Sequence, residues 1–173
     1  MLIQHSTIKD VELDEEHERL LLSLPLERLG DYPADLVVPS PHFVVFLAMD
    51  ATSVDDHEVL EFASRSLSQG AIWFCTWGPD CKRVHDLIDK ARDQRFPDPT
   101  DDTIRMTTWH NDDELADALW FAIYSACPAE IYIESCRAVL FITVGSPIGA
   151  KQIGEWLSAP EVLNQQLGLS DEP

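Results

Sequence analysis

Three short apolar runs, each followed by a segment of helical character, constrain the fold of this chain more than any other feature of its sequence. The runs cover residues 43–49, 71–77 and 138–144 and are rich in β-branched and aromatic side chains. An unbroken apolar run of this length is typical of a strand buried on both faces, and such strands belong to parallel sheets. The helical segments between them supply the crossover connections that parallel strands require.

The remaining segments complete an α/β pattern. Residues 103–109 alternate between polar and apolar side chains and predict a strand nearer the sheet edge, while residues 131–133 are expected to be a short extended piece. We therefore predict a single α/β domain over residues 1–173, built as a three-layer sandwich. Its central sheet is expected to be mostly parallel, with four to five strands and helices on both faces. Helices are expected over residues 55–69, 79–95, 114–126, 150–157 and 161–167.

The first 38 residues are expected to be an acidic N-terminal helix and a connector that pack on the main body. Acidic side chains crowd residues 10–18, and apolar or partly apolar side chains recur at helical spacing. Pro25 and the 30–33 segment then end the predicted helix. The helical stripe consists of Leu13, His17, Leu20, Leu21 and Leu24.

The net charge indicates which classes of partner this chain can bind. The chain holds 31 Asp and Glu against 12 Lys and Arg, which gives a formal charge of −19. Such a field repels nucleic acid and anionic membranes and speeds association with a basic protein. The alternative is that the acidity serves solubility alone.

Other features of the sequence favour a cytoplasmic protein. No apolar run approaches the roughly 20 residues that span a bilayer, and the first residues lack the pattern of a secretion signal. Cys75, Cys127 and Cys136 lie in apolar sequence, and the fourth cysteine is Cys81. We expect reduced thiols rather than disulfides, because a domain of this size does not need such crosslinks.

Candidate ligand-binding residues lie where the predicted strands end, because open parallel sheets bind ligands at that edge. Two strand ends share the pattern Thr-Trp-x-x-Asp, at residues 76–80 and 108–112. Two tryptophans on one rim would form an aromatic-walled cleft, although a repeated strand–turn–helix solution explains the pattern equally simply. In the first interpretation His110 is the natural acid–base group. The residues of this predicted pocket are Asp50, Trp77, Asp80, Cys81, Trp109 and His110.

Other motifs do not point to a cofactor or a metal. Cys81 and His85 share a helix face, yet their spacing matches no common zinc pattern. The 145–149 segment lacks the Gly-Lys-Ser/Thr of a phosphate-binding loop. We therefore predict no metal, no cofactor and no identifiable catalytic residue.

Two functional hypotheses follow. The first is a non-enzymatic acidic binding protein, such as an immunity or antitoxin-like inhibitor of a basic partner protein. The alternative is a small enzyme or ligand-binding domain with a pocket at the carboxyl ends of the strands. A monomer or a small homo-oligomer is compatible with both. The partner-binding surface of the first hypothesis consists of Glu12, Asp14, Glu15, Glu16, Glu18, Asp55, Asp56 and Glu58.

Overall fold

The computed structural model describes residues 1–9, 18–98, 100, 103–145 and 149–169. Within these ranges the chain forms one six-stranded sheet in the order β1-β2-β6-β3-β4-β5. β1 runs antiparallel to β2, and all other neighbours are parallel. The strands are β1 (Ile3–Lys9), β2 (Glu18–Leu26), β3 (His42–Ala48), β4 (Ala71–Trp77), β5 (Met106–His110) and β6 (Cys136–Val144).

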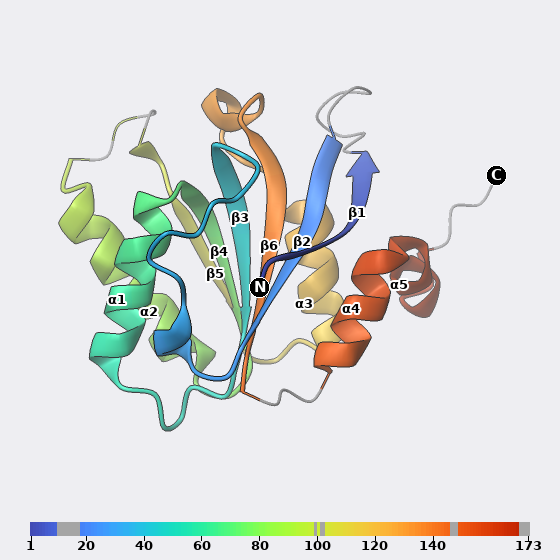
Figure 1. Ribbon diagram of the computed structural model, residues 1–173, viewed down its shortest axis with the longest axis horizontal. Coiled ribbons are helices and arrows are strands. Elements are labelled where there is room, and N and C mark those ends of the chain that lie inside the picture. The colour runs from blue at the N-terminus through green and yellow to red at the C-terminus, as the bar shows by residue number, and fades with distance from the viewer. Residues whose placement is uncertain (10–17, 99, 101–102, 146–148, 170–173) are drawn as a thin grey trace.

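Helices cover both faces of the sheet, as Figure 1 shows. On one face lie α1 (Asp56–Ser68) and α2 (Cys81–Arg95), together with the 3-10 turn η1 (Leu29–Asp31). On the other face lie α3 (Leu115–Trp120), its π-helical continuation η3 (Phe121–Ser125), α4 (Ala150–Ser158) and α5 (Pro160–Gln166). The predicted three-layer α/β sandwich with a mostly parallel sheet is confirmed, with six strands rather than four to five. None of the helices in the described ranges combines the length and apolar character needed to cross a bilayer.

The central strands are apolar because both of their faces are covered. Along β3 successive side chains point to opposite faces, so Val45 and Leu47 pack against α1 and α2, while Val44 and Phe46 join the core under α3 to α5. All four side chains are at most 1% exposed.

The predicted acidic N-terminal helix is wrong over residues 18–26, whereas residues 10–17, with Leu13 and His17 of the predicted stripe, lie outside the described residues. Residues 18–26 form β2, which lies between β1 and β6 and buries Leu22 and Leu24 on one face and Leu21 on the other. A strand apolar on both faces and a helix with an apolar stripe produce similar leucine spacings, and leucine favours helices intrinsically. Pro25, which was expected to help end that helix, lies near the end of the strand with its side chain exposed.

Two shorter predictions have different outcomes. Residues 131–133 are not extended, because Glu130–Tyr132 form the 3-10 turn η4. The alternating segment does form an edge strand, β5, which pairs with β4 alone among the described strands.

The topology creates a crevice between β3 and β6. These neighbours are parallel, so both end at the same edge of the sheet. The chain leaving β3 enters α1 on one face, and the chain leaving β6 enters α4 on the opposite face. Such a switch point at the carboxyl edge is where open α/β sheets usually bind ligands.

Candidate functional site

A cavity of about 590 Å³ opens at this switch point. Its volume lies in the range of small-molecule sites, which is roughly 300–1,000 Å³. The ends of β2, β3, β4 and β6 and the first turn of α1 contribute to its wall. The lining residues are Glu27, Arg28, Leu29, Ala48, Met49, Asp50, Ser53, Val54, Glu58, Trp77, Pro79, Val144 and Gly145.

Asp50 places a carboxylate directly after β3. One of its oxygens, Oδ1, accepts hydrogen bonds from the backbone N–H of Thr52 at 3.0 Å and from the hydroxyl of Thr52 at 2.6 Å. These bonds stabilise the charged form and hold the pKa of Asp50 below its usual value. Asp50 therefore contributes a fixed negative charge to the cavity mouth.

Glu58 and Glu27 supply two further carboxylates. Glu58 reaches back from α1 to accept a 2.6 Å hydrogen bond from the backbone N–H of Gly30, which ties η1 to α1. Glu27 follows β2 and is exposed. Among the described lining residues Arg28 is the cation, and it forms a 3.1 Å ion pair with Asp31, so its charge is already matched.

Charged contacts also fix the loop between β3 and α1. Arg83 of α2 donates to the carbonyl oxygens of Ala51 at 2.6 Å and Val54 at 3.1 Å, and it forms ion pairs with Asp56 and Asp80. The N-terminus of α1 is capped from within, because the side chain of Asp55 accepts the backbone N–H of His57 at 2.8 Å. This helix terminus is therefore already occupied by a carboxylate.

The structure brings only two of the six predicted pocket residues to the cavity. Asp50 and Trp77 line it, whereas Asp80, Cys81, Trp109 and His110 do not. The indole N–H of Trp77 donates to the carbonyl oxygen of Asp113 at 3.0 Å, which fixes the orientation of this ring.

The two tryptophans do not form a common cleft. Trp77 is the register partner of His110, whereas Trp109 is the partner of Thr76. Because paired residues on neighbouring strands point to the same face, the one-residue offset sends the two rings to opposite faces. Trp77 packs toward the α3 side, and Trp109 lies edge-on against His85 of α2 at 4.6 Å between ring centroids.

Asp80 and Cys81 lie at the start of α2 and make contacts within the protein there. Asp80 adopts a left-handed backbone conformation with φ 63° and pairs with Arg83 at 2.6 Å. Cys81 is buried, and its burial raises the pKa of the thiol, which opposes a nucleophilic role. Its carbonyl oxygen accepts the hydroxyl of Thr76 at 3.1 Å.

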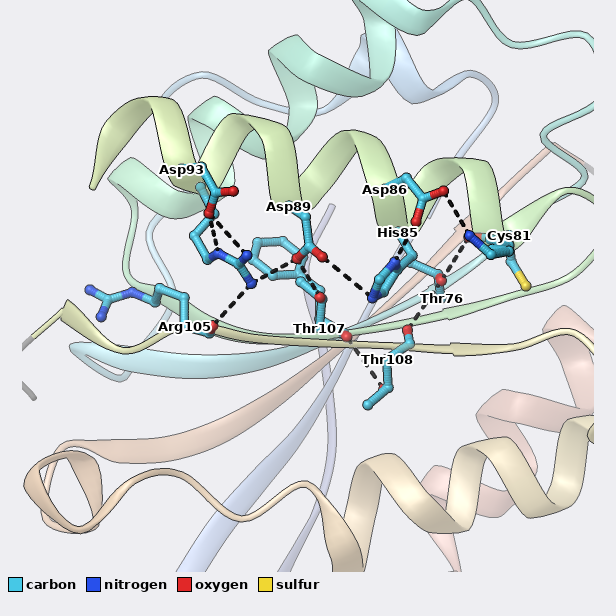
Figure 2. Close-up of polar contacts among 12 residues, drawn as sticks. Thr76, Cys81, His85, Asp86, Asp89, Asp93, Arg105, Thr107 and Thr108 are labelled. Atoms are coloured by element: carbon cyan, nitrogen blue, oxygen red, sulfur yellow. Dashed lines mark hydrogen bonds and ion pairs between the residues drawn. The ribbon is translucent and has the colours of Figure 1, made fainter. Parts of the chain in front are cut away.

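His85 belongs to a network that joins α2 to β5, drawn in Figure 2. Its Nδ1 lies 3.0 Å from Asp86 and its Nε2 lies 3.6 Å from Asp89. Asp89 also accepts the hydroxyl of Thr107 at 2.5 Å and pairs with Arg92 at 2.7 Å. The network fastens the helix to the edge strand, and each carboxylate in it has a protein partner.

His110 is likewise enclosed. It is 7% exposed, and its two ring nitrogens lie 2.6 Å from Asp113 and 3.1 Å from the hydroxyl of Thr108. Its ring packs on Phe121 with centroids 4.9 Å apart. Among the described residues, no group of three or more histidine, cysteine, aspartate or glutamate side chains is placed to hold a metal ion.

The predicted acidic surface divides into three parts. Glu12, Asp14, Glu15 and Glu16 lie outside the described residues, and Glu18 is exposed at the start of β2. Asp55, Asp56 and Glu58 lie at the start of α1, each with the protein partner described above.

Sequence reasoning missed the part of the cavity that β2 contributes. Glu27, Arg28 and Leu29 directly follow β2, whose sequence was interpreted as helical. The sequence feature that could have revealed this part of the cavity is the charged pair Glu27-Arg28, which directly follows a leucine-rich run.

A comparison with family profiles identifies a family that covers most of the chain. Residues 24–160 match a family described as "Domain of unknown function (DUF7684)", a span that starts within β2 and ends at the first residue of α5. No curated protein matches the chain.

Proposed function

We propose that this chain, which belongs to the DUF7684 family of domains of unknown function, binds a small organic molecule in the cavity at the carboxyl edge of its sheet. The observation that carries this proposal is the coincidence of an open cavity of about 590 Å³ with the switch point between β3 and β6. Apolar walls from Met49, Val54 and Trp77 and a few polar groups give the composition typical of ligand sites.

The composition of the lining favours binding over catalysis. Its described residues include no histidine and no cysteine, and its carboxylates Asp50 and Glu58 accept hydrogen bonds from the protein itself. The polar network around His85 and the buried ring of His110 both lie outside this lining. We therefore propose a binding domain rather than an enzyme.

Filling the cavity tests the proposal. A fragment library containing cationic, neutral and anionic compounds would be screened by amide chemical shifts on the isotope-labelled protein. We expect binders to perturb the amides of Ala48, Met49 and Gly145, and we expect Val144→Trp to abolish their binding by occupying the space. Val162→Trp, on the exposed face of α5, is the matched control.

Thermal unfolding of each variant would separate loss of the cavity from loss of the fold, and Val54→Trp offers a second filling variant. A library without any fragment that perturbs these amides, or fragments that still bind to a folded Val144→Trp protein, would refute the proposal.

We also propose a second candidate function, an acidic binding protein that engages a basic partner protein in the manner of an immunity or antitoxin-like inhibitor. The observation that favours it is the uneven charge along the carboxyl edge. Segments 27–31, 50–58, 80–83 and 111–114 together contain ten Asp or Glu and three Lys or Arg. A cationic protein surface would associate quickly with such an edge.

Native mass spectrometry of the protein isolated from its own cells at low salt would test this candidate. We expect a basic protein to be retained and to dissociate as salt rises, because exposed charges are screened beyond about 10 Å at 0.1 M ionic strength. Retention that is independent of salt, or a lone chain at low salt, would contradict it.

A further inference from the structure

We infer that the cavity at the β3–β6 switch point selects a small organic cation, with an ammonium group on an apolar body, over neutral and anionic ligands of the same shape. This inference rests on the proposed ligand-binding function and deepens it by assigning the class of ligand. The cavity supplies the site, and the charges around it decide which ligand fits.

The charge balance of the lining is negative. Its described residues include three carboxylates and one guanidinium, and that guanidinium, on Arg28, is paired with Asp31 outside the lining. Arg83, the next cation along the loop, is neutralised by two carboxylates and donates to two backbone oxygens. No cation near the cavity is therefore left to balance an anionic ligand among the described residues.

The N-terminus of α1, the helix whose first turn lines the cavity at the switch point, is also poorly suited to an anion. Phosphates and carboxylates bind to the free N–H groups of a helix N-terminus. At α1 the side chain of Asp55 already accepts one of these groups, and Asp56 and Glu58 lie in the same first turn. An anion approaching this helix terminus would meet three carboxylates.

The remaining lining favours an organic cation over a bare metal ion. Leu29, Met49, Val54 and Val144 provide apolar contact area for the body of such a ligand. The described carboxylates are not grouped as metal ligands. A cationic head near Asp50 and Glu27 with an apolar body against Met49 and Val54 satisfies both the charged and the apolar part of the lining.

Three probes of one shape test the inference: 2-phenylethylamine, 2-phenylethanol and phenylacetate. Their dissociation constants would be measured by amide chemical-shift titration at one ionic strength and pH 7. We expect the amine to bind at least about fivefold more tightly than the alcohol, and phenylacetate to bind most weakly. Two charges about 4 Å apart interact appreciably even where they are partly exposed and solvent screens them.

Charge-removing variants locate the effect. Glu27→Gln and Asp50→Asn are each expected to weaken the binding of the amine about threefold more than they weaken the binding of the alcohol. Glu161→Gln, on an exposed position of α5, removes one charge from the whole protein at a position outside the lining and is the matched control.

The outcomes separate the two claims. An alcohol that binds as tightly as the amine, or phenylacetate as the tightest ligand, overturns the cation inference while the ligand-binding function stands. An amine preference that Glu161→Gln reduces as much as Glu27→Gln also overturns it, since the preference would then reflect overall charge. Failure of all three probes, together with a fragment library that perturbs no amide of the cavity, overturns both claims.

Discussion

The guanidinium of Arg19 donates a 2.6 Å hydrogen bond from Nη2 to the backbone carbonyl oxygen of Ile123, inside the core. Its Nη1 donates to the carbonyl oxygen of Ala126 at 3.3 Å, and the side chain is 0% exposed. Both oxygens lie at the end of the π-helical turn η3, where carbonyl groups lack partners within the helix. The charged side chain of Arg19 in β2 thus donates hydrogen bonds to carbonyl groups at the end of η3, the helical segment that precedes β6. These contacts link β2 to η3 across the core.

Arg19→Met should therefore lower the free energy of unfolding substantially. The thioether fills similar space but leaves two buried carbonyl oxygens without these donors, and a hydrogen bond to a charged group is worth about 1.5–3 kcal/mol. We expect a loss of about 2–4 kcal/mol in urea unfolding. Arg95→Met, at an exposed position of α2, should cost less than about 0.5 kcal/mol. Equal losses in the two variants would show that the carbonyl contacts do not stabilise the fold.

The sequence predicted the central layer of the fold because that layer obeys simple burial rules. Phe43–Met49 is covered on both faces, so its composition is continuously apolar and only a buried strand fits it. β2 escaped detection because leucine runs do not distinguish a doubly covered strand from a helix without knowledge of its neighbours. Those neighbours, β1 and β6, are separated from it by very different lengths of chain.

The site was predictable only in part for a related reason. Asp50 and Trp77 were identified because they end strands that the sequence reveals. The pairing of Thr76 with Trp109 is a register of the folded sheet, and nothing in either Thr-Trp-x-x-Asp segment specifies it. Glu27 was missed together with the strand that positions it.

Gly78 should be intolerant of a side chain, since the end of β4 passes close to the end of β3 beneath the cavity. Its φ is +111°, and a Cβ there would lie 2.2 Å from the carbonyl oxygen of Met49. Gly168 also has a positive φ, +69°, but a Cβ there meets nothing within 4 Å. Gly168→Ala should cost about 1 kcal/mol through backbone strain alone, and Gly78→Ala at least about 2 kcal/mol more, because two backbone segments must separate.

Equilibrium unfolding of both variants would measure that difference. If Gly78→Ala lowers the free energy of unfolding no more than Gly168→Ala does, the two strand ends do not approach each other closely at this point.

The four cysteines should differ in reactivity. None forms a disulfide, and the structure describes all four. Burial raises the pKa of Cys75 to about 12 and raises that of Cys81, so both stay protonated at pH 8. Cys127 is half-buried, whereas Cys136 is 0% exposed.

In the native protein we expect a maleimide reagent at pH 8 to label Cys127 first, and the other three only after unfolding. Peptide mass spectrometry at timed intervals would identify the labelled residues. Rapid labelling of Cys75 in the native state, at a rate similar to that in urea, would contradict its burial.

Stability should fall as the pH drops below about 6.5, because His42 resists protonation in the folded protein. Burial lowers its pKa, and the charge of Arg105 adds to the effect. Its Nδ1 lies 2.8 Å from the hydroxyl oxygen of Ser135, and its ring packs on Tyr132. The unfolded chain has the ordinary histidine pKa of about 6.5, so between that value and the lowered folded pKa it binds more protons than the native state. The contribution is therefore complete above about pH 6.5 and is lost as the pH falls through the folded pKa.

Burial lowers the pKa of His5 as well, so its titration acts in the same direction. Replacing His42 with Asn keeps a polar group near Ser135 and removes the proton site, so the decline in the free energy of unfolding between pH 7.5 and pH 5 should become shallower. The double variant with His5→Asn should flatten it further. Urea unfolding at pH 7.5, 6.0 and 5.0 measures these slopes, with His57→Asn at an exposed position of α1 as the matched substitution. A His42→Asn protein with the slope of the parent would mean that this histidine titrates alike in the folded and unfolded chains.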